Sequence, residues 1–190
     1  ILESIKWLGI TFDEFHRQSE RKEIHRKYLE KLLKDGNAFW CYHAPEELEE
    51  ERNRQIANKE VQKHDCDHKP STSSGNNYSL NEAQAKSKGK GVIRFKNPNK
   101  KVRFNDLIRE KIEFDSSLLG DFVIAKSLDE PLYNFAVVAD DFDMKISHVI
   151  RGEDHISNTP KQILLNEALN FPNPEFAHIP LTLGPDKTKL

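Results

Sequence analysis

Apolar positions near the start of the chain recur at helical spacing. Ile24, Tyr28 and Leu32 follow one another every four residues, which places them on one helix face. Ser19 is a suitable N-cap for this helix, and Gly36 suits the position just beyond its end. The apolar face needs no explanation beyond ordinary core packing, so it predicts structure and not a binding site.

The pattern becomes more polar after residue 44. Proline is favoured at the first position of a helix, so a second helix is expected to begin at Pro45. Its charged stretch over 49–54 leaves only a thin apolar face, which indicates a mostly solvated helix. Residues 69–91 hold almost no large apolar side chains, and we expect a mobile loop there.

Short runs rich in β-branched and aromatic residues follow this loop. Such short β-patterned runs predict a small, mostly antiparallel insertion. The runs are Val92–Phe95, Val102–Phe104, Ile112–Phe114 and Phe122–Ala125.

The last third of the chain contains two near-continuous apolar runs, Phe135–Ala139 and Ile146–Ile150. Such runs are typical of strands buried on both faces of a parallel sheet. The second is followed by the polar segment Arg151–His155. In α/β sheets ligands bind at the carboxyl ends of strands, so this segment is a candidate small-molecule site.

A helix is expected directly after that segment. Thr159 fits the N-cap, Pro160 the first helical position and Gln162 the third, which together form a capping box with a leading proline. Strand, polar loop and capped helix make a βα unit of a doubly wound fold, so the predicted fold class is α/β.

Composition sets limits on function. The 190 residues are 36% hydrophobic and carry a net charge of -2, which is enough for one sizeable core, or for a core plus a small insertion. No apolar run is long enough to cross a membrane, and no signal peptide is visible. With two cysteines a disulfide framework is not expected, so we expect a protein of the reducing cytoplasm with no membrane partner.

Two pairs of ligand-type residues form a candidate metal site. Cys41 and His43 are one residue apart, as are Cys66 and His68. Two thiolates and two imidazoles form a closed tetrahedral set suited to structural zinc. His64 is an alternative ligand two residues before Cys66. A disulfide between the cysteines is the competing interpretation, and it requires an oxidising compartment.

A basic stretch extends from Lys86 to Arg103 and contains eight Lys or Arg residues and no acid. Binding to a phosphate backbone is the functional interpretation. Charge runs are more often solvated strand faces and loops, and on composition alone that interpretation is preferred. The candidates for nucleic-acid contact are Arg94, Lys96, Lys100 and Lys101.

The segment 135–162, and above all His148 to Gln162 with its Arg-Gly-Glu-Asp-His and Ser-Asn-Thr-Pro runs, strongly resembles bacterial-type glutamyl-tRNA synthetases. The resemblance extends to residues 6–9 and 17–21, and to 176–190, and is weakest at about 50–91. It implies a class I synthetase catalytic domain, with 1–36 in the first half of a Rossmann-like nucleotide-binding fold. It further implies an inserted α+β, zinc-binding subdomain at 37–131 and the second half of the fold at 132–190.

The resemblance also implies an activity. Members activate glutamate with ATP and Mg²⁺ and transfer it to the 3′ end of tRNA(Glu). Members commonly carry a zinc site in the insertion, which makes Zn²⁺ the expected structural metal here, with His43 replacing a cysteine. The insertion contacts the acceptor end of tRNA, and we expect a monomer.

Site residues follow by position from the same resemblance. Tyr133 and Arg151 correspond to residues that line the glutamate pocket, Arg151 being the one that pairs with the substrate's side-chain carboxylate. A guanidinium fork can hold a carboxylate by two parallel bonds. Val137 stands where some members have asparagine. Asp154 is implied near glutamate, and the residues implied near ATP are His155, Leu181 and Thr182.

Two alternatives to the ligase are a glutamyl-queuosine-type tRNA-modifying glutamyl transferase and a non-catalytic zinc-stabilised tRNA-binding module. The family's two ATP-handling motifs are not complete within residues 1–190, and the second has only begun at Lys189-Leu190. We therefore expect this stretch of chain by itself to form no adenylate.

Overall fold

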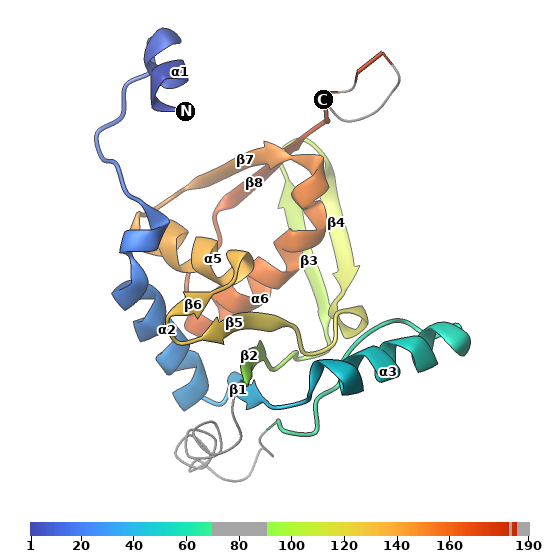
Figure 1. Cartoon of the computed structure of the whole chain (residues 1–190). Coiled ribbons are helices and arrows are strands. Elements are labelled where there is room, and N and C mark those ends of the chain that lie inside the picture. Colours follow the sequence, from blue (N-terminus) through green and yellow to red (C-terminus); the bar gives the residue numbers. More distant parts are fainter. Residues whose placement is uncertain (70–90, 183, 186–190) are drawn as a thin grey trace.

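The computed structural model describes residues 1–69, 91–182, 184 and 185. The predicted loop at 69–91 therefore falls almost wholly outside the described residues. Among the described residues, two four-stranded sheets and four helices of 11 to 13 residues make up the body of the molecule, while the short helix α1 (Leu2–Trp7) stands apart at the end of an extended segment (Figure 1).

Sheet A has the order β1-β2-β5-β6, and every neighbouring pair is antiparallel. Successive side chains of strand β1 point to opposite faces of this sheet and enter two different clusters. Ala38 and Trp40 face the main core, while Phe39 and Cys41 face a small cluster that contains Cys66. The strands are β1 (Ala38–Cys41), β2 (Val92–Phe95), β5 (Val123–Ser127) and β6 (Glu130–Pro131).

Sheet B has the order β4-β3-β8-β7 and is mixed. The hairpin of β3 (Lys101–Asp106) and β4 (Glu110–Asp115) is antiparallel, as predicted. However, β3 also pairs in parallel with β8 (Glu175–Ile179), which in turn pairs in parallel with β7 (His148–Gly152). The strands predicted as one antiparallel unit are thus divided between two sheets, because β3 finds its second partner near the end of the chain.

The run Phe135–Ala139 is not a strand, and this prediction was wrong. It lies in helix α5 (Tyr133–Asp143), where Phe135, Val138 and Ala139 are buried at helical spacing. A short, continuous apolar run suits a buried helix as well as a buried strand, and periodicity alone does not separate them.

The helix predictions were right in existence and partly wrong at the ends. Helix α2 (Lys22–Lys34) begins after Arg21, because Ser19 lies in the 3-10 turn η1 (Gln18–Glu20). Gly36 has the positive φ of 73° expected beyond a helix end. Helix α3 (Pro45–Ala57) begins with its proline and has no buried residue.

The capping box proposed for the following helix does not form. The segment after β7 is a 3-10 helix, η3 (Glu153–Asn158), which runs directly into α6 (Thr159–Leu169). Thr159 already has helical dihedral angles and is buried, so its hydroxyl is directed to other partners. Gln162 donates instead to Asn134 Oδ1 at 3.1 Å.

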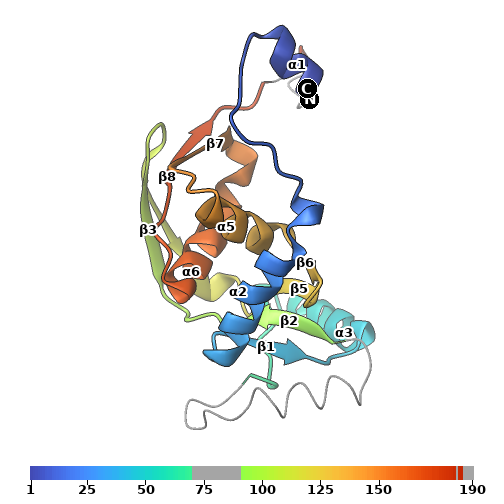
Figure 2. The ribbon, with the colours of Figure 1, turned by 90° about the vertical axis from the view of Figure 1, so that its left-hand side faces the viewer.

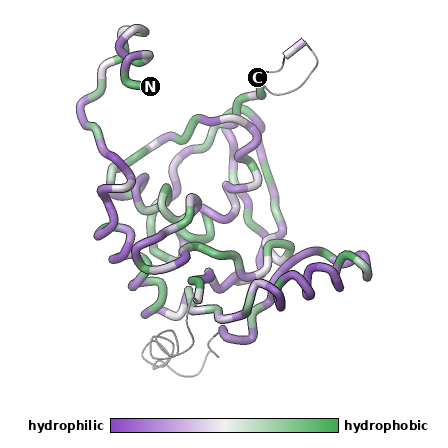
Figure 3. The backbone as a smooth tube through the Cα atoms, viewed as in Figure 1, coloured by the Kyte–Doolittle hydropathy of each residue, from purple (hydrophilic) through white to green (hydrophobic). Residues whose placement is uncertain are grey.

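One main core joins the two sheets. Buried side chains of α2, α5 and α6 pack with those of β1, β2, β3, β5 and β8 in a single cluster. Figure 2 shows sheet B at one side, α5 and α6 beside it and α2 beyond. Apolar positions accordingly concentrate along α5, α6 and the inner strands, whereas α3 is largely polar (Figure 3). The division of the chain at 36 and 131 stays a prediction.

Candidate functional site

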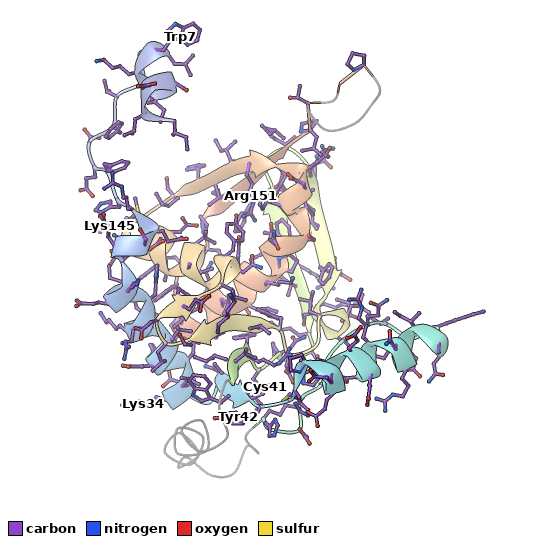
Figure 4. The ribbon with its side chains drawn as sticks, in the orientation of Figure 1. Trp7, Lys34, Cys41, Tyr42, Lys145 and Arg151 are labelled. Atoms are coloured by element: carbon purple, nitrogen blue, oxygen red, sulfur yellow. The ribbon has the colours of Figure 1, made fainter. Side chains whose placement is uncertain are left out.

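Arg151 lies near the end of β7, beside its register partner His178 on the parallel strand β8. Arg151 lies at the opposite end of the molecule from Cys41 (Figure 4). The guanidinium Nε donates to His178 Nε2 at 3.1 Å, and Nη2 donates to Thr159 Oγ1 at 2.8 Å. The predicted carboxylate-binding arginine is therefore held by two hydrogen bonds along one edge of its guanidinium.

Burial dominates the electrostatics of this arginine. Desolvation lowers the pKa of Arg151, while Tyr133, Asp141 and Asp106 favour its charged form. Asp141, half-buried on α5, has its pKa raised to about 6 by desolvation, which the charge of Arg151 partly opposes. A partly desolvated guanidinium is a strong partner for an incoming carboxylate, since little water competes for it.

Two members of this site were not assigned from the sequence. His178 is fully buried and places Nδ1 2.5 Å from Asp106 Oδ2. Asp106 is 1% exposed and ends β3. The sequence offered a signal only for His178, an ionisable residue among the apolar Phe176, Ala177 and Ile179. Asp106 ends a strand that already carries Lys101 and Arg103, so nothing in the local pattern marks it.

Of the two predicted pocket residues on α5, Tyr133 interacts with this arginine. Tyr133 begins the helix and places its hydroxyl 3.4 Å from His155 Nδ1, which also lies 3.2 Å from Asn158 Nδ2. Val137 is one turn further along and half-buried. Tyr133 and His155, predicted for different substrates, are thus brought together.

The remaining predicted residues surround Gly152. A Cβ atom on Gly152 would lie 2.6 Å from Asp154 Oδ1 and 3.3 Å from Leu181 Cδ2. The backbone N–H of Leu181 donates to Glu153 Oε1 at 3.2 Å, which fixes the chain after β8 over the start of η3. Thr182 follows and is exposed.

The predicted metal ligands converge at the far end of the molecule, between the end of β1 and the segment 64–68. Ligand atoms of Cys41, His43, His64 and Cys66 lie within 4.8 Å of one another, and His43, Cys66, Asp67 and His68 form a second such group. Both cysteines are free and buried, so the alternative disulfide is not formed.

The spacing of these atoms suits a tetrahedral ion. With Zn–S of about 2.3 Å and Zn–N of about 2.05 Å, tetrahedral angles place sulfur and nitrogen ligands about 3.6 Å apart. The Sγ–N distances are 3.4 Å from Cys41 to His43, 3.9 Å from Cys41 to His64, and 3.6 Å from Cys66 to both His43 and His68. The residues present therefore fit a metal, with His64 and His68 both within reach.

Surrounding groups support this cluster. His64 Nδ1 lies 2.5 Å from Glu51 Oε2, an arrangement that directs the other ring nitrogen toward a metal. The hydrogen bond from Cys66 holds the pKa of Cys41 well below its usual range, and the same bond raises the pKa of Cys66. A thiolate is the form that binds metal.

A turn at Gly120 and Asp121 cradles the cysteine loop. Gly120 has φ of 60°, and a Cβ there would lie 2.6 Å from the backbone oxygen of His64. Asp121 Oδ2 accepts from the backbone N–H of Cys66 at 3.1 Å, and Oδ1 accepts from that of Asn97 at 3.0 Å. The loop is thereby tied to sheet A through one buried carboxylate.

The basic residues proposed for nucleic-acid contact differ in exposure. Arg94 is only 7% exposed and donates from Nη1 to the carbonyl of Asp121 at 2.7 Å, so its direct contact with a phosphate is not supported. Lys96 is half-buried. Lys100 and Lys101 are exposed and pair with Glu167 and Glu113.

Comparison with known proteins identifies the family. The model for class I tRNA synthetases (E and Q), catalytic domain, matches residues 1–190. This chain belongs to that family. The fold agrees: it superposes with a TM-score of 0.83 and 34% identity on a glutamate tRNA ligase from Elizabethkingia meningosepticum, crystallised in complex with its amino acid. That match covers 99% of this chain and 40% of the other.

Curated relatives agree with the family assignment. The chain is 49% identical to a glutamate–tRNA ligase of Sulfurihydrogenibium sp. and 50% identical to that of Aquifex aeolicus. All of this synthetase chain is covered in both, but only 41% and 39% of the relatives. It therefore spans about two fifths of the length of the ligases it resembles. No helix among its described residues is long and apolar enough to cross a bilayer.

Proposed function

We propose that this chain is part of a glutamate–tRNA ligase, which activates glutamate with ATP and transfers it to the 3′ end of tRNA(Glu). Within it, Arg151 binds the side-chain carboxylate of glutamate, beside Tyr133, Val137 and Asp154. The ATP side of the site is formed by His155, Leu181 and Thr182. The whole protein acts as a monomer in the cytoplasm, with Mg²⁺ accompanying ATP.

The observation that carries this proposal is the position of Arg151 at a strand end and the way its neighbours hold it. It lies at the carboxyl end of a parallel strand, where α/β folds bind their ligands. It is half-buried and fixed on one edge by His178 and Thr159. A fixed, partly desolvated guanidinium selects a planar anion that can accept two parallel bonds.

We further propose a structural zinc ion at the cysteine cluster. Cys41, His43 and Cys66 would hold it together with His64 or His68. The ion would supply folding free energy by linking the end of β1 to the loop at 64–68, and it would leave no open position for a substrate. An X-ray fluorescence scan of the native protein tests this, and the absence of a zinc edge would refute it.

Contact with the tRNA acceptor end is proposed for the same part of the chain. Lys100 and Lys101 are the exposed candidates, with Lys96 beside them, and a phosphate would compete with their present carboxylate partners. Replacing either lysine by glutamine should weaken tRNA binding modestly and reduce the slope of log K against log salt concentration by about one.

The activity is tested in the full-length protein by glutamate-dependent ATP–pyrophosphate exchange in the presence of tRNA. Arg151→Lys keeps the charge but loses the planar fork, and we expect kcat/KM for glutamate to fall about a hundredfold. Arg26→Lys is the matched control, because Arg26 is an exposed arginine paired with Asp129. A wild-type glutamate KM in Arg151→Lys would show that the pocket lies elsewhere.

A further inference from the structure

The proton arrangement around His178 is determined by its neighbours. His178 Nε2 lies 3.1 Å from Arg151 Nε, and an arginine N–H can only donate. Nε2 must therefore be the acceptor, and the ring proton must be on Nδ1. Nδ1 lies 2.5 Å from Asp106 Oδ2, so this proton is donated to Asp106.

Asp106 is built to accept that proton's hydrogen bond. Its Oδ1 accepts from the backbone N–H groups of Ile108, Arg109 and His178, at 3.0, 2.9 and 3.2 Å. Burial raises the pKa of Asp106, but these bonds and the one from His178 outweigh it and hold the pKa at about 2. An ionised Asp106 has no proton to give, which leaves one tautomer for His178.

The same arrangement orients the guanidinium. Thr159 Oγ1 accepts from Arg151 Nη2 at 2.8 Å and lies 3.2 Å from His178 Nε2, so both acceptors lie along one side of the arginine. The opposite tautomer would direct an Nε2–H at Arg151 Nε, donor against donor. His178 is fully buried on the strand next to Arg151, so its ring has little room to rotate and no water can separate the two donors.

We propose that Asp106 and His178 are positioning residues that hold the Arg151 guanidinium in one orientation and thereby favour a side-chain carboxylate over a carboxamide. This rests on the proposed function, in which Arg151 receives the glutamate side chain. A fixed guanidinium edge offers only donors. A carboxylate accepts two hydrogen bonds from this edge, whereas a carboxamide places its own N–H against one of the guanidinium N–H groups. A guanidinium that was free to rotate could avoid this donor–donor contact.

The decisive variant is Asp106→Asn in the full-length protein. An asparagine can keep its oxygen on the three backbone N–H groups while placing its NH2 against His178 Nδ1, which forces the ring proton onto Nε2. We expect kcat/KM for glutamate in ATP–pyrophosphate exchange with tRNA to fall about tenfold to a hundredfold through KM. The KM for ATP should change less than twofold, and the preference for glutamate over glutamine should narrow.

His178→Gln is the second variant, because a glutamine oxygen can replace the acceptor offered to Arg151. It should retain more glutamate activity than His178→Phe, which removes the acceptor and keeps the ring. His148→Gln, on the exposed first position of β7, is the matched control and should match wild type. A folded Asp106→Asn protein with unchanged glutamate KM overturns the proposal, as does an equal loss in the glutamate and ATP constants.

Nitrogen-15 chemical shifts of labelled histidine give a readout independent of activity. In wild type His178 should be neutral with its proton on Nδ1, and in Asp106→Asn the proton should move to Nε2. A wild-type proton on Nε2 overturns the inference even if the enzyme is a glutamate ligase. If the wild-type protein shows no glutamate-dependent exchange, the proposed function is wrong. The tautomer of His178 then still tests whether Asp106 and His178 position Arg151.

Discussion

Asp140 on α5 holds the N-terminal segment of the chain against the core. Its carboxylate accepts from Gln18 Nε2 at 2.8 Å, Arg21 Nε at 2.7 Å and His25 Nε2 at 2.9 Å. The hydrogen bond with Asp140 raises the pKa of Arg21, whose side chain is 9% exposed. Removing Asp140 therefore leaves a buried cation with one remaining carboxylate, Asp143, at 2.5 Å.

The magnitude follows from that geometry. Breaking a buried ion pair on one side costs about 3–5 kcal/mol, and the surviving bond to Asp143 puts Asp140→Ala near the lower end, at about 3 kcal/mol. Asp143→Ala is the matched control, since Asp143 is 39% exposed and Asp140 remains. We expect the control to cost about 1 kcal/mol or less.

The assay is urea unfolding of the protein at pH 7, combined with native-state hydrogen exchange at the amides of α2 and α5 to localise the loss. A cost for Asp140→Ala no larger than that of the control would refute the reasoning, because it would mean that Arg21 is rehydrated or re-paired without penalty.

The same carboxylate sets a pH dependence. Burial, the largest single influence, raises the pKa of Asp140, but the bonds from Gln18, Arg21 and His25 together hold it below its usual value. A depressed folded-state pKa stabilises the protein above the unfolded value of about 3.9 and ceases to do so as pH falls through the folded value. The stabilities of wild type and Asp140→Asn should therefore converge below about pH 4.

Three further changes test the two candidate sites. Glu51→Gln should weaken zinc binding about tenfold, measured by chelator competition, if the carboxylate orients His64 as a ligand; unchanged affinity would favour His68. Gly120→Ala should lower the free energy of unfolding by about 1–3 kcal/mol, because the new methyl group would clash with the backbone of His64 and the residue has a positive φ. An unchanged melting temperature would contradict the tight packing at this turn. Gly152→Ala should displace Asp154 and raise the KM values for the small substrates with little loss of stability; unchanged kinetics would place Asp154 outside the site.

The predictability of the fold varied with the kind of signal. Helices with a clear start signal, such as the one that begins at Pro45, were found correctly. Phe135–Ala139 was misassigned because a buried helix and a buried strand share the same apolar composition. The pairing of β3 with β8 joins segments about 70 residues apart, and no local pattern encodes that choice.

The candidate sites show the same limit. Arg151 and the cysteine pairs could be singled out because their residue types are chemically distinctive, and family resemblance gave Arg151 its role. His178 and Asp106 could not, since each acquires its importance only from a partner on another strand. Arg94 shows what a charge run does not reveal, because this basic residue is buried and donates to the carbonyl of Asp121.

The central position of β8 has a consequence for synthesis of the protein. Sheet B places this late strand between β3 and β7, so that the three polar residues Asp106, Arg151 and His178 come from three adjacent strands. On the ribosome the β3–β4 hairpin and β7 emerge first and cannot complete the sheet until residue 179 has left the exit tunnel. Their open edges are exposed during that interval, and the hydrogen bonds that join Arg151, His178 and Asp106 form only when the last of these strands is inserted.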